Sequence, residues 1–200
     1  MLNILPPPRE VSATGSQFPV SSMRLHAAGL SEDLQRCLVE ILVHAGLPVS
    51  NDGLWVLDVA QLAVSEVGAD VPRSVVEQYY ELTIDEGTVQ LAGGGAQGLL
   101  WGAQTLADLA GRSDSINLPA GHVRDWPDLL HRGLFIEDKW GPDRMLLADW
   151  QLLVDRLARL KMNTLGIGLY GCWGGCRFEG QPTEFLMVPI PGQPQLQTPK

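Results

Sequence analysis

The sequence predicts an α+β N-terminal domain, an antiparallel sheet covered by two helices, followed by the first one or two β/α units of a truncated TIM barrel. Three observations predict this. A hairpin pattern and two helical patterns precede residue 124. Two strand-like stretches, 131–137 and 161–170, flank the most amphipathic segment of the chain. Only residues 132–200 follow, whereas a closed barrel needs about 250, so the barrel is not expected to close within this chain.

Composition places the chain among globular proteins and argues against two classes of partner. The 200 residues are 45% hydrophobic and 18% charged, which is enough for a core. The net charge of −9 does not suit a nucleic acid or an anionic membrane, because both attract clustered Lys and Arg. No apolar run is long enough for a membrane span, and no signal peptide is seen at the start. We therefore expect a soluble protein, cytoplasmic rather than secreted.

The cysteines predict neither a disulfide framework nor a metal site. The chain has three, Cys37, Cys172 and Cys176. An odd number of this size favours reduced thiols, although a loop disulfide between Cys172 and Cys176 stays open for an oxidising compartment. No second Cys/His pair completes a tetrahedron with them. We expect no metal and no cofactor.

The first elements are short. Glu10–Ala13 is predicted to be an edge strand ending at a Gly15-Ser16 turn, and 23–26 a second strand. Ser31 can cap a helix that runs to about Ala45, with one apolar face.

The central region gives stronger signals. The apolar run 54–59 suits a covered strand, and 78–84 and 88–91 alternate around a turn, which is typical of a hairpin. Residues 96–110 have helical spacing. Within that helix, Gly98 and Gly102 would let it approach the sheet closely. Residues 112–125 show no periodicity and are predicted to be a linker.

The predicted boundary lies near Arg124. Residues 1–124 form the N-terminal α/β domain, and 125–180 begin the (β/α)8 barrel, with an amphipathic helix over 142–161. Residues 181–200 are rich in proline and are predicted to be loop or disordered.

Several of these pieces together resemble the N-terminal half of glycoside hydrolase family 20, the β-N-acetylhexosaminidases. They are the hairpin 79–91, the run Gly98-Leu-Leu-Trp-Gly-Ala-Gln-Thr-Leu106, Asp125-Trp126-Pro127 and Arg132-Gly133-Leu134. The resemblance implies a retaining hydrolase of O-glycosyl bonds in which an Asp positions the acetamido group of the substrate as nucleophile and a Glu is the acid/base. That pair follows the fourth barrel strand in the family, so the resemblance places it outside this chain and implies that the chain alone is inactive.

The chain departs from the family pattern in its second barrel strand. Where the family commonly has His-x-His, this sequence has Gly166-Ile167-Gly168. O-GlcNAcase-like enzymes and α-glucuronidases, which have a similar leading domain, therefore remain alternatives.

Five residues are candidates for substrate binding: Arg132, Glu137, Asp138, Trp140 and Trp173. The resemblance implies that Arg132 binds sugar hydroxyls, which a planar guanidinium can do with two parallel hydrogen bonds; the alternative is an ion pair with Asp125 or Asp128. The two acids end a predicted barrel strand, where ligands bind, or are solvated or capping groups. Each tryptophan could stack on a sugar or fill a core.

Two functions are open. The first is the leading part of a β-N-acetylhexosaminidase-like glycoside hydrolase, whose partners are an N-acetylhexosamine-containing glycan and the rest of the barrel. The second is a non-catalytic carbohydrate-binding or scaffolding domain. An apolar helix stripe and unpaired parallel strands favour the first, because both need a cover.

Overall fold

The structure is a computed structural model that describes residues 4–111, 116–136, 145–167, 177–178 and 181–182. It divides into two units. The first comprises Met1–Leu130 and Arg159–Lys161, and the second His131–Ala158 and Met162–Lys200.

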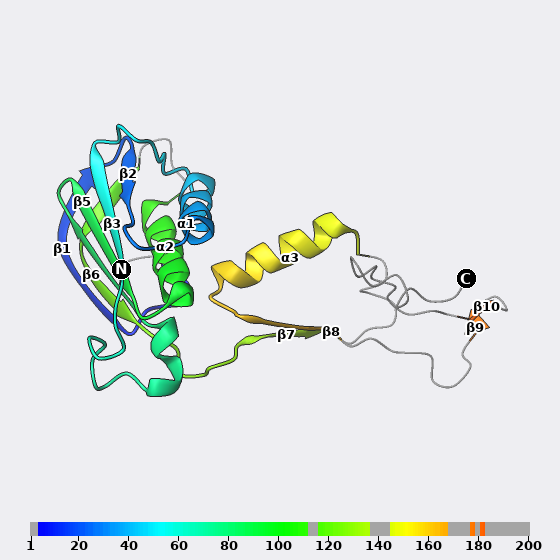
Figure 1. Cartoon of the computed structure of the whole chain (residues 1–200). Coiled ribbons are helices and arrows are strands. Elements are labelled where there is room, and N and C mark those ends of the chain that lie inside the picture. Colours follow the sequence, from blue (N-terminus) through cyan, green and yellow to red (C-terminus); the bar gives the residue numbers. More distant parts are fainter. Residues whose placement is uncertain (1–3, 112–115, 137–144, 168–176, 179–180, 183–200) are drawn as a thin grey trace. The chain divides into compact units, whose positions relative to one another are not determined.

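The first unit is built on a six-stranded sheet with the strand order β1-β6-β4-β5-β3-β2 (Figure 1). The strands are β1 (Glu10–Pro19), β2 (Met23–His26), β3 (Trp55–Gln61), β4 (Tyr80–Asp85), β5 (Thr88–Gly93) and β6 (Asn117–Asp125). The predicted hairpin is confirmed: β4 and β5 pair antiparallel from Asp85↔Thr88 to Tyr80↔Gly93, around Gly87 with φ 77°.

The prediction of an antiparallel sheet is wrong for two of the five pairings. β2 pairs parallel with β3, and β3 pairs parallel with β5, so the sheet is mixed. The physical reason for the first pair is the helix between its strands. α1 (Glu32–His44) carries the chain back to the end of the sheet where β2 began, which is the connection that a parallel pair requires.

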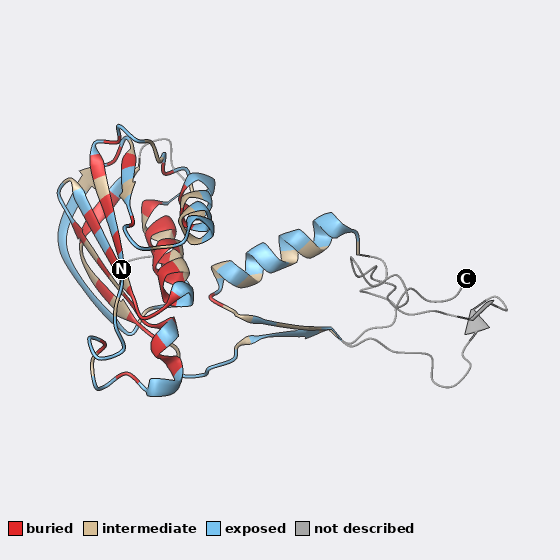
Figure 2. Cartoon of the chain, viewed as in Figure 1, coloured by how far each residue is buried: buried red, intermediate tan, exposed pale blue. Residues whose placement is uncertain are grey.

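Two helices cover one face of this sheet, as predicted. α2 (Ala96–Ala110) packs on β3, β4, β5 and β6, and α1 packs on α2. A short 3-10 helix, η1 (Arg73–Gln78), also contacts α2. The predicted cap of α1 is confirmed, because the Ser31 side chain accepts a hydrogen bond from the Leu34 N–H at 3.3 Å. Figure 2 shows the buried residues concentrated between α2 and the sheet.

The two helix glycines have the role that their spacing predicted. A Cβ at Gly98 would lie 2.0 Å from the Tyr79 carbonyl oxygen, and one at Gly102 would lie 2.2 Å from Leu91 Cδ1. Real Cβ atoms do not approach other atoms so closely. The closeness of α2 to the sheet therefore depends on hydrogen at both positions.

The predicted linker over 112–125 is wrong. Residues 117–125 form β6, which lies between β1 and β4 in the sheet. Sequence periodicity did not reveal this strand because Pro119 and Gly121 interrupt its alternation and because it is buried on part of both faces. Its neighbours are far along the chain: Glu10 is opposite Arg124, and Tyr80 is opposite Asp125.

The first edge strand is longer than predicted. β1 does not stop before Gly15-Ser16 but continues to Pro19. In place of the expected turn, the strand has a shift of register between Ala13 and Gln17, where Gly15 has a φ of 87°. Such a bulge bends an edge strand without ending its pairing.

The second unit contains a β/α/β segment. β7 (Gly133–Ile136) and β8 (Thr164–Ile167) pair parallel, starting at Gly133↔Thr164, and α3 (Leu147–Arg159) connects them. The helix was predicted over 142–161, of which 142–144 lie outside the described residues. β9 (Arg177–Phe178) and β10 (Gln181–Pro182) form a separate short pair. Among the described residues, no helix combines the length and the apolar character needed to cross a membrane.

Candidate functional site

Arg132 is the candidate residue that the structure describes best. It is partly exposed and directly precedes β7. Its N–H donates to Asn163 Oδ1 at 2.9 Å, and its carbonyl oxygen accepts from the N–H groups of Asn163 at 2.8 Å and Thr164 at 3.0 Å. A Cβ at Gly133 would lie 1.9 Å from the Thr164 carbonyl oxygen. The Arg-Gly pair therefore has a local reason: only glycine lets β7 approach β8 immediately after the arginine.

The other four candidates, Glu137, Asp138, Trp140 and Trp173, lie outside the described residues. Glu137 directly follows Ile136, the last residue of β7, whereas Arg132 precedes the first. Four strand residues span about 13 Å. Arg132 and Glu137 therefore lie at opposite ends of β7.

The acids considered as ion-pair partners of Arg132 both have other partners. Asp128 pairs with Arg9. Asp125 pairs with Lys161, with 3.1 Å between Asp125 Oδ2 and Lys161 Nζ.

Arg124 of β6 lies at the centre of a cluster of charged and aromatic side chains that the sequence did not reveal. Its guanidinium makes two hydrogen bonds of 2.7 Å to the Asp70 carboxylate and one of 2.9 Å to Tyr79 Oη. It lies 4.7 Å from the centre of the Trp126 ring, and Arg9 lies 4.8 Å from the same ring. The hydrogen bonds from Arg124 hold the pKa of Asp70 below its ordinary value, and Asp70 raises the pKa of Arg124. Through the Asp70–Arg124 ion pair, the cluster holds the segment between β3 and η1 against β6.

We expect Asp70→Asn to loosen that segment, because the bidentate ion pair is lost. Trypsin should then cut after the exposed Arg73 several-fold faster than in the wild type. In the wild type the segment should also detach from Arg124 as the pH falls below about 4, because Asp70 then takes up a proton. A carboxyl whose pKa is lowered in the folded state stabilises the fold only while it is ionised. Asp52→Asn, another exposed acid, is the control and should leave the cleavage rate unchanged.

A second polar cluster is buried under α2. Lys161 is 3% exposed, and its Nζ donates to Tyr80 Oη at 2.8 Å and to Asp125 Oδ2 at 3.1 Å. Tyr80 Oη also donates to Asp125 Oδ2 at 3.1 Å and shares a hydrogen bond of 2.7 Å with Thr105 Oγ1. Burial, with a further contribution from Asp125, raises the pKa of Tyr80 well above its ordinary value, so the phenol keeps its proton. No spacing rule relates positions 80, 125 and 161, so the sequence did not indicate this cluster.

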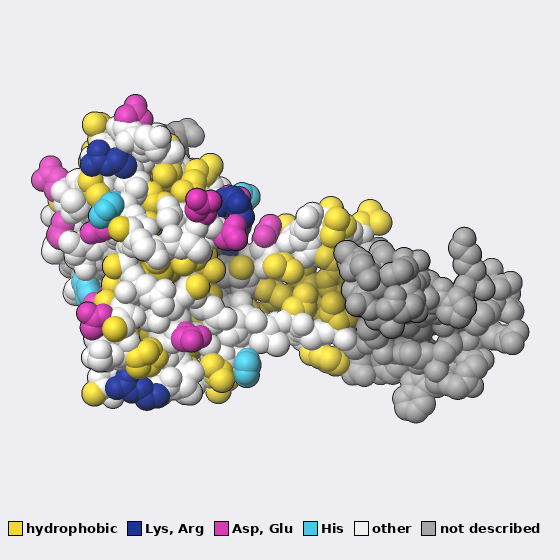
Figure 3. Space-filling view, in the orientation of Figure 1, with side chains coloured by type: hydrophobic (Ala, Val, Ile, Leu, Met, Phe, Trp, Pro, Cys, Tyr) yellow, Lys and Arg dark blue, Asp and Glu magenta, His cyan; other side chains and the backbone are white. Residues whose placement is uncertain are grey.

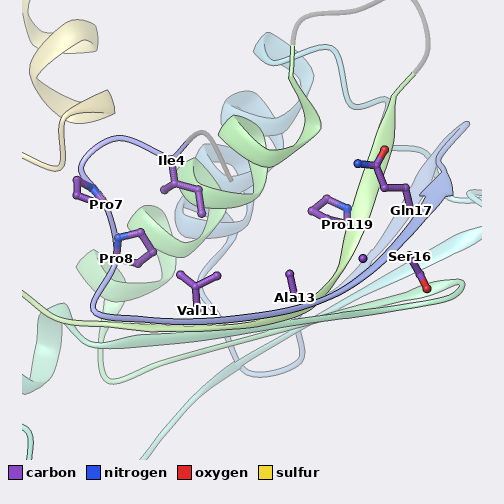
Figure 4. A pocket seen from close by; sticks show the side chains of 9 residues that line it. Ile4, Pro7, Pro8, Val11, Ala13, Ser16, Gln17 and Pro119 are labelled. Atoms are coloured by element: carbon purple, nitrogen blue, oxygen red, sulfur yellow. The ribbon is translucent and has the colours of Figure 1, made fainter. Parts of the chain in front are cut away.

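The described residues also form an apolar groove beside β1 (Figure 4). Its volume is about 480 Å³, and Ile4, Pro7, Pro8 and Val11 line much of it. None of its lining side chains is a titratable group. Across the described ranges, no three His, Cys, Asp or Glu side chains gather closely enough to hold a metal ion. The groove therefore offers no acid–base or metal chemistry.

A family model and a known protein both match part of this chain. The family model described as glycosyl hydrolase family 20, domain 2, matches residues 1–126. A β-hexosaminidase from Akkermansia muciniphila is 31% identical over 125 residues, which is 60% of this chain and 22% of that protein.

Solved structures share the fold. A family 20 exo-β-N-acetylglucosaminidase from Vibrio harveyi, solved in complex with N-acetylglucosamine, matches with a TM-score of 0.65 at 19% identity, over 84% of this chain and 25% of its own. A family 20 β-N-acetylglucosaminidase matches with a TM-score of 0.60 at 26% identity, over 84% of this chain and 31% of its own. The chain thus spans about a quarter of the length of these relatives. With more than half of its residues matched by the family model, the chain belongs to glycoside hydrolase family 20.

Proposed function

We propose that this chain is the N-terminal portion of a β-N-acetylhexosaminidase-like glycoside hydrolase. In this proposal 1–124 is the leading α/β domain, 125–180 begins the (β/α)8 barrel, and 181–200 is a proline-rich loop or disordered tail. The observation that carries it is the family match over 1–126 followed by the β7-α3-β8 segment, which starts with Arg132-Gly133.

The surface of the second unit supports a continuing barrel. No residue of α3 is buried. Leu146 and Leu147 are 73% and 74% exposed, and Phe135 on β7 is 62% exposed. Figure 3 shows apolar side chains gathered on this unit. A parallel sheet in soluble proteins has both faces covered, so further β/α units are the cover that this surface fits.

The proposed chemistry is that of the parent enzyme. The substrate is a glycan with a terminal N-acetylhexosamine, in line with the sugar bound in the Vibrio harveyi relative. The acetamido oxygen of the substrate acts as nucleophile, an Asp positions it, and a Glu is the general acid/base. This chain supplies Arg132 for the sugar hydroxyls, and Glu137, Asp138, Trp140 and Trp173 for the rim of the subsite. The Asp–Glu pair follows the fourth barrel strand, so the 200-residue chain by itself should not hydrolyse a glycoside.

A chimera tests this assignment. Residues 1–180 would replace the equivalent part of the Akkermansia muciniphila β-hexosaminidase, and hydrolysis of a chromogenic N-acetylglucosaminide would be measured. We expect the chimera to be active and Arg132→Met to lower kcat/KM about 100-fold, because charge-assisted bidentate hydrogen bonds are lost. Arg132→Lys keeps the charge without the fork and should fall between the two.

Two results would count against the proposal. One is turnover by the purified 200-residue chain. The other is tight calorimetric binding of N-acetylglucosamine by that chain, which would favour the carbohydrate-binding domain instead. A chimera whose activity does not change on Arg132→Met would remove Arg132 from the sugar site.

A further inference from the structure

Asn163, which lies just before β8, holds the peptide of Arg132. Its Oδ1 accepts from the Arg132 N–H at 2.9 Å and from Thr164 Oγ1 at 3.2 Å. The Arg132 carbonyl oxygen accepts from the backbone of 163 and 164. Both polar groups of the Arg132 backbone are thus bonded to one short segment. The side chain of Asn163 supplies the bond that regular pairing of β7 with β8 does not.

We propose that Asn163 is a positioning residue for Arg132, because it fixes the backbone from which the arginine side chain extends. This inference rests on the proposed role of Arg132 in sugar binding. Asn163 acts through Arg132 and not on the sugar. A guanidinium that makes two parallel hydrogen bonds depends on such support, since small displacements cost much of the interaction.

Amide hydrogen exchange, followed by NMR on the 200-residue chain, tests the inference without any activity measurement. Asn163→Leu should speed exchange of the Arg132 amide about tenfold, because its acceptor is removed. Asn163→Asp keeps an acceptor oxygen and should restore the slow rate. Leu91, in the middle of the first sheet, reports global unfolding and should exchange at the wild-type rate in both variants. If Arg132 and Leu91 change together in both variants, or if Asn163→Leu leaves Arg132 protected, the proposal is wrong. Because exchange is measured on the chain alone, this result is independent of whether the chimera hydrolyses a glycoside.

Discussion

Lys161→Met should destabilise the first unit by about 3–5 kcal/mol, the largest single effect that we expect. The variant keeps most of the apolar stem but leaves the buried Asp125 carboxylate without its cation. Asp125 side-chain atoms are 13% exposed, so water does not replace the lost partner. Urea unfolding of the 200-residue chain at pH 7, followed by tryptophan fluorescence, measures the change.

A double variant identifies the cause. Lys161→Met/Asp125→Asn leaves no buried charge without a partner, so it should recover part of the stability that the single variant loses. A double variant that is no more stable than Lys161→Met would show that Asp125 does not depend on Lys161.

Gly98→Ala should cost about 3 kcal/mol, although alanine is the better helix former by about 1 kcal/mol. The new Cβ would lie 2.0 Å from the Tyr79 carbonyl oxygen. That oxygen also accepts the Gly94 N–H at 2.9 Å, so it is not free to retreat. Either α2 moves away from the sheet or the entry to β4 shifts. Thermal unfolding of the variant measures the loss.

Two alanine variants of the same helix are the controls. Gly102→Ala meets the far end of the Leu91 side chain, which can rotate, before it meets the Tyr80 ring. It should cost less than Gly98→Ala. Gln97→Ala is exposed and should be neutral within about 0.5 kcal/mol. Equal stability of all three variants would mean that α2 does not need to lie close to the sheet.

Features that depend on neighbours in the sequence were predictable. The Ser31 cap, the helix 96–110 and the hairpin around Gly87 each depend on contacts within a few residues, and the structure confirms them. The resemblance to family 20 came from short local runs of the same kind, and the family match bears it out.

Features that depend on distant partners were not predictable. β6 lacks a pattern of its own and is a strand because β1 and β4 bind its two edges. The parallel pairing of β3 with β5 depends on where the chain returns after η1, which no short window contains. The Arg124 and Lys161 clusters likewise join residues from separate segments.

The sequence by itself determined the Ser31 cap, the helix 96–110 and the hairpin around Gly87, because propensity, capping and turn chemistry act over a few residues. Its resemblance to the family also identified Arg132 as the residue to examine. Only the tertiary structure decided that the sheet is mixed and that Lys161 is buried against Asp125. It also decided that Asn163 holds the backbone of Arg132. Those outcomes depend on which segments, distant in the sequence, pack together in the folded chain. A buried charge such as that of Lys161 is stable only where folding brings its partner to it.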